Sequence, residues 1–577
     1  MDIIKDKDMH MDVAGQLCFF FVLMTIVVSS CLGLGVNMVQ LYITPTTNVT
    51  CPAKPCLTLH QFATNVSWIK PSTTLIFLSG IHRLNSEVSI SGISNLSMLS
   101  NLALEGYIAC HQGAEFKFDN IDNLQIRGLK FVGCGNNRAL SIKLFTVENS
   151  IFQGENDSET ALMVNETNII IKNSSFLSNT AGTCLWIFDV IGDILVCVGG
   201  AIFATHSNIN ITKSKLVGNS AEIGGAIYIH QNSNITINDS TFFGNQVKNV
   251  KFDTRCLPHW TENKAKFGPC SGGAIAMFQS RLIINGSTFS NNTSECANGG
   301  AGALSVQEDS HAAIDNSEFW NNNVNAFGGA VTIARRSTMI INNCTFHNNS
   351  ASQGGVMYVM LSAVIVVNHS NFTNNSANLS GGAITTDQSS QLNISGSQFI
   401  RNKASTGGAL SAARSKVNFT DSILSNNKAT ESGGAVYILQ SDIVFGVGPH
   451  GYCILAGNFA INGGGVYAIE STLYMHGKLT IMSNMASDTG GGLYLYHSNL
   501  IGYYSSNIVI SGNKANNKGG GIHAINSLIT AYCTCRKTKS QEGSIHFIEN
   551  VAQKRGGICL ESAAQIRVQK NWRSLPK

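Results

Sequence analysis

Carboxylates at equivalent positions of a repeating chain are the first residues to test for chemistry. A glycoside hydrolase needs two of them about 5 to 9.5 Å apart. The chain repeats itself about every 26 residues, so neighbouring repeats would have to supply such a pair. Asp239 and Asp421 share a turn position but lie many repeats apart, and Asp387 is matched by Arg414 one repeat on. These spacings do not supply the two neighbouring carboxylates of a hydrolytic centre.

Base and metal chemistry have no stronger support in the sequence. A lyase needs a base, usually beside calcium bound by Asp. Glu470 and His497 are in register on neighbouring repeats, but they form an isolated pair, which we interpret as a surface contact. No Cys-x-x-Cys recurs with the histidine spacing of a zinc site, and Cys533-Thr534-Cys535 is the nearest approach. We therefore expect no catalytic residue, no metal and no cofactor.

The elements that must position any such residue are short and repeated. Each repeat opens with a glycine pair. Counted from the first glycine, the fourth and sixth positions are mostly apolar, and this period of two predicts a strand. Two more alternating runs and a polar linker, often Asn-x-Ala, complete the repeat. The pairs, or close variants of them, begin at Gly199, Gly224, Gly272, Ala301, Gly328, Gly354, Gly381, Gly407, Gly433, Gly463, Gly490, Gly519 and Gly556.

Three short strands and three turns in about 26 residues predict an all-β solenoid, a right-handed single-stranded parallel β-helix with one coil per repeat. A leucine-rich repeat would need L-x-x-L-x-L, and a calcium-binding β-roll would need Asp in its turns; neither is present. Equivalent residues then stack on one another. Phe or Leu fills an interior layer, Asn occupies a turn where it accepts the left-handed conformation and bonds along the stack, and Gly forms a sharp corner.

Two literal motifs alternate along the chain and carry a resemblance to known proteins. GGAI begins at Gly199, Gly224, Gly272 and Gly381, and F-x-x-N begins at Phe176, Phe242, Phe289, Phe319, Phe346, Phe372, Phe399 and Phe547. The pattern resembles the repeats of chlamydial polymorphic membrane proteins and of animal right-handed β-helix domain proteins of the pectin-lyase-like superfamily. The resemblance covers roughly residues 170 to 560 and implies an extracellular domain used in adhesion or recognition.

The same resemblance carries an enzymatic alternative, because pectin-lyase-like folds include polysaccharide lyases and glycoside hydrolases. Gly448-Pro449-His450-Gly451 is faintly similar to the Gly-His-Gly of polygalacturonases, but the paired Asp motifs that should precede it are missing. The leading interpretation is a non-catalytic extracellular β-helix with a structural, adhesion or recognition role. The abundance of glycosylation motifs favours the animal type.

The chain divides into a leader, a cap and two series of coils. An apolar run at 17–28 is typical of a signal peptide or, if uncleaved, a signal anchor. Helical spacing at 56–63 predicts a capping helix, which would cover the open end of the solenoid. The expected divisions are 1–33 signal, 41–75 cap segment, 76–198 irregular coils, 199–570 regular coils with an inserted loop at 248–271, and 571–577 a truncated tail.

Several features predict a secreted or cell-surface protein. The chain holds 20 Asn-x-Ser/Thr motifs, with glycosylation candidates at Asn48, Asn65, Asn95, Asn156, Asn234 and Asn378. A net charge of +4 without a basic run excludes a nucleic-acid partner. Membrane attachment is expected only through an uncleaved signal or a missing C-terminal segment.

Close cysteine pairs predict local disulfides, which form in an oxidising compartment. The expected pairs are Cys51 with Cys56, Cys110 with Cys134, Cys184 with Cys197, and Cys256 with Cys270. The last two pairs each bracket a departure from the repeat, so their disulfides would close the two irregular segments.

One surface feature predicts a binding site. The outward-facing fifth position after the glycine pair is Tyr437, Tyr467, Tyr494 and His523 in four successive coils. Stacked at the coil rise, these rings form an aromatic strip suited to sugar rings or a protein partner. The alternative is that Tyr simply packs on itself across strands. The partner is unknown, with a glycan or a cell-surface protein as the two classes considered.

Overall fold

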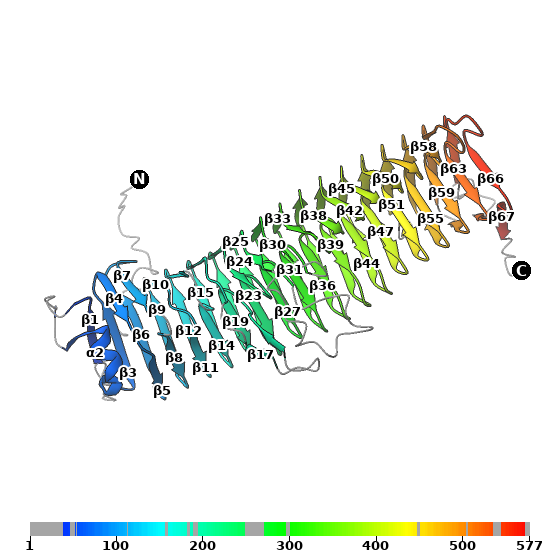
Figure 1. Ribbon diagram of the computed structural model, residues 1–577. Coiled ribbons are helices and arrows are strands. Elements are labelled where there is room, and N and C mark those ends of the chain that lie inside the picture. The colour runs from blue at the N-terminus through cyan, green and yellow to red at the C-terminus, as the bar shows by residue number, and fades with distance from the viewer. Residues whose placement is uncertain are drawn as a thin grey trace, which may run out of the picture.

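The computed structural model of the chain describes residues 39–46, 52, 55–111, 114–155, 160–181, 185–187, 194–248, 271–295, 300–446, 451–503, 506–534 and 544–571. The expected signal segment, most of the inserted loop and nearly all of the tail lie outside these residues. The described residues form one long solenoid whose coils stack from the N-terminal to the C-terminal end (Figure 1). The parallel β-helix predicted from the repeat is confirmed.

A regular coil contains four strands, as the coil that begins at Val436 illustrates. Its strands are β51 (Val436–Leu439), β52 (Asp442–Phe445), β53 (Tyr452–Ala456) and β54 (Phe459–Asn462). Each pairs in parallel with its equivalent in the next coil, and the four resulting sheets are called C, A, B and D in that order. We expected three strands per coil, but the polar linker forms the fourth, in a sheet of 11 short strands within the described residues.

Sheet C follows the glycine corner of each coil and carries the candidate surface discussed below. Its strands are β5 (Val88–Ser91), β8 (Phe116–Asp119), β11 (Asn137–Leu140), β14 (Leu162–Asn165), β19 (Ile202–Thr205), β23 (Ile227–His230), β27 (Ile275–Phe278), β31 (Leu304–Gln307), β35 (Val331–Ile333), β39 (Met357–Val359), β43 (Ile384–Thr386), β47 (Leu410–Ala413), β51, β55 (Val466–Ile469), β59 (Leu493–Tyr496), β63 (Ile522–Ile525) and β66 (Ile558–Glu561).

Two ladders fill the interior on the sheet B side. The rings of Phe372 and Phe399 stack with centroids 4.5 Å apart, and both side chains are fully buried. Asn402 lies three residues after Phe399 and is also fully buried. Its Nδ2 donates to the Phe372 carbonyl at 2.9 Å and to Asn427 Oδ1 at 3.0 Å. These hydrogen bonds satisfy the buried amide, as burial requires.

The ladder asparagines do not themselves adopt the left-handed conformation that we expected. The residue before each one does: Arg401 has φ of 57° and Asn426 has φ of 55°. The turn therefore places its strained residue on the outside and leaves the amide of the next residue pointing inward. The predicted hydrogen bonding along the ladder is confirmed.

The glycine pair makes the corner from sheet D to sheet C for two separate reasons. At Gly407, φ is 63° and an added Cβ would lie 2.1 Å from the Leu410 carbonyl oxygen. At Gly408, an added Cβ would lie 2.2 Å from a backbone oxygen of the next coil, that of Gly434. The first glycine permits the sharp turn, and the second permits the close approach of coils.

The N-terminal end is covered by a short helix. Strands β1 (Val39–Thr44) and β2 (Cys56–Thr58) precede α2 (Leu59–Thr64), which buries Leu59 and Phe62. The helix begins three residues later than the expected 56–63, because Thr58 is its N-cap and forms a capping box with Gln61. A 3-10 turn, η1 (Val66–Trp68), leads to β3 (Ser72–Phe77).

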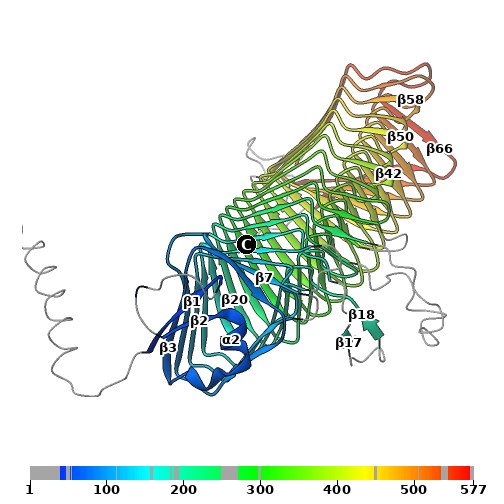
Figure 2. The same cartoon turned by 60° about the vertical axis from the view of Figure 1, so that its left-hand side comes forward.

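Two insertions project from the coils, and the strand pairing between coils continues on either side of them. Strands β17 (Leu185–Ile187) and β18 (Ile194–Val196) pair antiparallel beside the solenoid (Figure 2). Around them Leu162 still pairs with Ile202, and across the 248–271 insertion Ile227 still pairs with Ile275. The solenoid is therefore a rigid support whose outer loops vary. Among the described residues, no helix has the length and apolar character needed to cross a membrane.

Candidate functional site

The predicted aromatic strip is assembled on the outer face of sheet C. Tyr437 of β51 pairs with Tyr467 of β55, Tyr467 pairs with Tyr494 of β59, and Tyr494 pairs with His523 of β63. The two residues that flank each of them in its strand point inward and are buried. The alternation of a strand thus fixes the four rings in one row, as the repeat predicted. We refer to Tyr437, Tyr467, Tyr494 and His523 as the strip.

The rings of the strip stack on each other and offer their edges to the outside. Tyr437 and Tyr467 are parallel with centroids 5.6 Å apart, and Tyr467 and Tyr494 are 4.6 Å apart. His523 meets Tyr494 edge to face at 5.1 Å. A sugar ring therefore has no access to the faces between the tyrosines. Among the three tyrosines, only Tyr437 has a ring face without an aromatic neighbour, because its partner in the preceding coil is Ser411.

We expected the side chains of the strip to point to solvent, and they are less exposed than expected. The three tyrosines are half-buried and His523 is only 3% exposed. The glycine corners explain the cover, since a Cβ at Gly463 would lie 2.9 Å from Tyr467 Cβ. The corner backbone thus lies against the base of each ring. What remains exposed is the outer edge, where the hydroxyl is.

Burial also sets the protonation of the strip. It raises the pKa of Tyr467 to about 12, with smaller contributions from the neighbouring tyrosines. Burial likewise raises the pKa of Tyr437, assisted by Glu431, and that of Tyr494, assisted by Glu561. Each hydroxyl therefore keeps its proton at neutral pH and is available both to donate and to accept a hydrogen bond.

At the C-terminal end of the strip lies a polar cluster that the sequence did not reveal. The ligating atoms of His523, Cys559 and Glu561 are all within 4.8 Å of one another. Burial lowers the pKa of His523, and the nearby Glu561 carboxylate opposes this shift without cancelling it. The two strands that carry these residues are in register, but the last repeat step is 37 residues rather than about 26. That irregular step conceals the cluster in the sequence, where its three residues match no recurring metal-site spacing.

The same face of sheet C is different in its middle coils. Of the six equivalent residues there, five are small, namely Ala276, Ser305, Thr332, Thr385 and Ser411, and the sixth is the buried Tyr358. All five are buried by the same glycine corners. The fold therefore accepts small side chains at this position, and a run of tyrosines is not required to build the coil.

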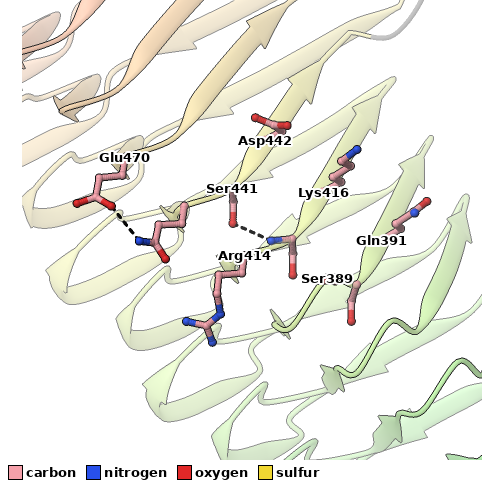
Figure 3. Close-up of a pocket in the computed structure, with 10 residues that line it drawn as sticks. Ser389, Gln391, Arg414, Lys416, Ser441, Asp442 and Glu470 are labelled. Atoms are coloured by element: carbon pink, nitrogen blue, oxygen red, sulfur yellow. Dashed lines mark hydrogen bonds between the residues drawn. The ribbon is translucent and has the colours of Figure 1, made fainter.

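A shallow polar hollow of about 560 Å³ lies where sheet C turns into sheet A (Figure 3). Arg414, Lys416, Asp442 and Glu470 line it, so its charges are mixed. Gln440 Nε2 donates to Glu470 at 2.9 Å, and the Ser415 amide donates to Ser441 Oγ at 3.1 Å. The lining thus combines two basic and two acidic side chains.

The acids that the sequence singled out are held in contacts between coils. Asp387 pairs with Arg414 at 2.6 Å, and Asp421 Oδ1 accepts the Tyr452 amide at 3.0 Å. Both acids are thus held by partners on a neighbouring coil. The surface contact expected between Glu470 and His497 is not observed among the described residues. Glu470 bonds Gln440, as above, whereas His497 stacks edge to face on Tyr496 at 4.3 Å. The motif at 448–451 lies mostly outside the described residues.

One disulfide is described with both its cysteines. It joins Cys110 to Cys134, a pair that we expected, across neighbouring coils. Among the described cysteines, three are buried free thiols: Cys344, Cys453 and Cys559. The thiol of Cys559 therefore remains available to the cluster at the end of the strip.

The other expected disulfides involve cysteines that lie outside the described residues. Cys56 and Cys197 are disulfide-bonded, but their expected partners, Cys51 and Cys184, are not described. Neither Cys256 nor Cys270 is described, so the expected disulfide between Cys256 and Cys270 stays a prediction.

Four of the glycosylation candidates are described, and all four are exposed: Asn65, Asn95, Asn234 and Asn378. Two of them use the amide nitrogen within the protein. Asn95 Nδ2 donates to Ser72, and Asn234 Nδ2 donates to Asn208. Asn48 and Asn156 lie outside the described residues. Asn65 and Asn378 remain the better-placed acceptors of a glycan.

Comparisons with known proteins agree with this architecture. The family described as right handed beta helix region matches residues 226–399, and the Chlamydia polymorphic membrane protein repeat matches residues 421–439 and 507–525. The right-handed parallel β-helix is thus confirmed, and two short segments match the chlamydial repeat, as expected. The metabotropic glutamate receptor-like protein R of Dictyostelium discoideum is 21% identical over 300 residues, which are 51% of this chain and 16% of that protein. The chain therefore spans only a small part of that relative.

Solved structures with some likeness include enzymes and an adhesin. The periplasmic alginate epimerase AlgG aligns with a TM-score of 0.35 and 12% identity, over 66% of this chain and 76% of its own. PfbA, a surface adhesin of Streptococcus pneumoniae, aligns with a TM-score of 0.24 and 10% identity, over 86% of both chains. Likeness at this level does not decide between catalysis and adhesion.

Proposed function

We propose that the chain is a secreted or cell-surface β-helix with a recognition role, and that Tyr437, Tyr467 and Tyr494 form its binding surface. The observation that carries the proposal is the unbroken run of three half-exposed tyrosines, at a position where the middle coils have small residues and a single, buried Tyr358. Tyrosine edges combine an apolar rim with a hydroxyl, which suits an interface that is partly wet. The solenoid supplies the rigidity.

The stacked geometry defines how a partner would lie. The hydroxyls form a row along the solenoid axis, so an elongated glycan or an extended segment of a cell-surface protein fits better than a single sugar ring. Hydrogen bonds to the row would provide most of the contact, with ring stacking confined to the free face of Tyr437. Glu431 and Asp488 lie near the row, since they act electrostatically on Tyr437 and Tyr494.

Extracellular placement has independent support. Disulfides such as Cys110–Cys134 persist in oxidising compartments. The apolar segment at 17–28 and the 20 glycosylation motifs are typical of secreted chains. The match to chlamydial polymorphic membrane protein repeats and the receptor-like name of the Dictyostelium relative are in keeping with a surface location.

A screen of the purified protein against a glycan array and against intact cells tests the recognition role. We expect binding by the wild type and reduced binding by the triple variant Tyr437→Phe, Tyr467→Phe, Tyr494→Phe, which keeps the stacked rings and removes only the hydroxyls. Enzymatic removal of cell-surface glycans separates a glycan partner from a protein partner. Release of unsaturated uronides or reducing sugar from a polysaccharide panel would contradict the non-catalytic role and favour a lyase or hydrolase.

A further inference from the structure

The cluster at the end of the strip brings three different metal-ligand types together on one face. His523 and Cys559 are directly opposite each other on β63 and β66, and Glu561 lies two residues beyond Cys559 on the same side of its strand. Their ligating atoms are within 4.8 Å of one another. His523 is 3% exposed and Cys559 is 4% exposed.

The buried imidazole of His523 lacks the hydrogen bonds that burial normally demands. Neither Nδ1 nor Nε2 has a hydrogen-bond partner among the described residues. Nε2 lies 3.2 Å from Glu561 Oε2, but the alignment is not that of a hydrogen bond. A buried polar ring whose nitrogens lack aligned hydrogen bonds destabilises the fold. Such a ring marks a place where another group is expected.

Glu561 is already oriented by a neighbour. Lys518 Nζ contacts Glu561 Oε1 at 2.5 Å, which leaves Oε2 turned toward the imidazole. Carboxylates that bind metals are commonly held in this way by a second group. Two ligand atoms bonded to tetrahedral zinc at about 2.0–2.1 Å are separated by about 3.3 Å. The 3.2 Å between His523 Nε2 and Glu561 Oε2 matches that separation.

We propose that His523, Cys559 and Glu561 bind one zinc ion at the C-terminal end of the strip. Nitrogen, sulfur and oxygen donors in this combination suit Zn²⁺, whereas Ca²⁺ and Mg²⁺ require oxygen ligands. Three protein ligands leave a fourth position for water or for an oxygen atom of a bound molecule. The site is independent of the proposed recognition role, since it can bind zinc whether or not the tyrosines bind a partner.

The test measures binding of zinc alone to the tag-free full chain, by isothermal titration and by metal analysis after equilibrium dialysis. The wild type should bind one zinc ion at the site. Cys559→Ser should weaken zinc binding by about a hundredfold or more, because loss of even an outer-shell partner costs 10–100-fold. Cys344→Ser is the matched control: it removes another buried free thiol, which lies far along the solenoid from the cluster, and should leave zinc binding unchanged.

Cobalt provides a second readout that a general loss of stability would not mimic. The cobalt-loaded wild type and Cys344→Ser should show a thiolate-to-metal charge-transfer band that Cys559→Ser lacks. Glu561→Gln covers the case in which Cys559→Ser fails to fold, because the Glu561 side chain is 33% exposed and keeps its shape in the variant. Zinc affinity that is equal in the wild type, Cys559→Ser and Glu561→Gln would overturn the site, as would a wild type that binds no zinc.

Discussion

Two columns of stacked aromatic rings run along this solenoid, one inside it and one outside. The inner column includes Phe372 and Phe399, with centroids 4.5 Å apart, and the outer one includes Tyr467 and Tyr494, with centroids 4.6 Å apart. These two distances are close to the coil rise, which sets the spacing in both columns, although Tyr437 and Tyr467 are 5.6 Å apart. The inner rings are fully buried, whereas the outer rings keep an exposed edge. Stacking alone is thus a property of the fold, and exposure distinguishes a surface that is free to bind.

The two columns also differ in how strongly the fold constrains their sequence. At the inner position, the residues aligned with Phe372 and Phe399 along sheet B are again large and apolar, such as Phe346 and Leu424. At the outer position, Tyr gives way to Ser411 within one coil. An inner substitution should therefore affect stability, and an outer one should affect binding.

The largest expected effect is on the inner column. Phe372→Ala should destabilise the surrounding coils by about 3–5 kcal/mol, because it removes a fully buried ring and leaves a cavity. Tyr467→Ser should cost only about 1 kcal/mol, the scale of a cross-strand pair. Hydrogen exchange of amides in β41 (Asn371–Thr373) and β55 reports local stability. Equal losses in the two variants would erase the distinction between the columns.

A second, smaller effect concerns amides rather than rings. The backbone amide and Nδ2 of Asn375 both donate to Asn402 Oδ1 at 3.0 Å. Asn402→Ala therefore leaves the buried amide without a partner and removes one of the two bonds of Nδ2, which also donates to the Phe346 carbonyl. We expect a loss of about 2–4 kcal/mol. The matched outer change is Asn418→Ala, which removes a single bond to Asn393 on a half-buried face and should cost about 0.5–1 kcal/mol. Urea unfolding of the two variants compares them, and an equal or reversed order would contradict an inner amide ladder that stabilises the coils.

The smallest effect is specific to the outer column and appears only in alkali. The pKa of Tyr467 is raised to about 12, from about 10 for an exposed tyrosine. The folded state thus holds this proton more tightly than the unfolded state does. The contribution of the protonated Tyr467 hydroxyl to the stability of the fold should be complete below pH about 10 and should be lost as the pH rises toward 12. Tyrosinate absorbance of the wild type minus that of Tyr467→Phe should titrate near pH 12; titration near pH 10 would show an uncovered ring.

Most of the fold could be predicted from the sequence, because residue types recur most regularly at the positions that fill the interior of the solenoid. Asn402 and Phe399 recur with the period of the coil, and the Gly407–Gly408 pair has two steric reasons to recur, so the periodicity predicted both the solenoid and its register. The fourth strand was missed because two or three polar residues of a linker show no alternation. The half-burial of Tyr467 was missed because it depends on how closely Gly463 approaches, and sequence patterns do not encode that distance.

The candidate site could be predicted only in part, for a similar reason. The strip follows from register and was found. The cluster of His523, Cys559 and Glu561 depends on an irregular last coil, in which sequence spacing no longer reports spatial neighbours. Rules of periodicity therefore locate residues on regular coils and fail at the ends.

The most direct test of the account is the dissociation constant of the partner found in the screen, measured for the wild type and two variants. The variant Tyr437→Ser, Tyr467→Ser, Tyr494→Ser should bind about tenfold to a hundredfold more weakly, equivalent to about 1–3 kcal/mol. Its fold should be retained. The control Ile283→Ser, Ile340→Ser removes exposed apolar side chains from the outer face of sheet A and should bind like the wild type. Unchanged binding by a folded triple tyrosine variant would contradict the account and leave the outer column as ordinary sheet packing.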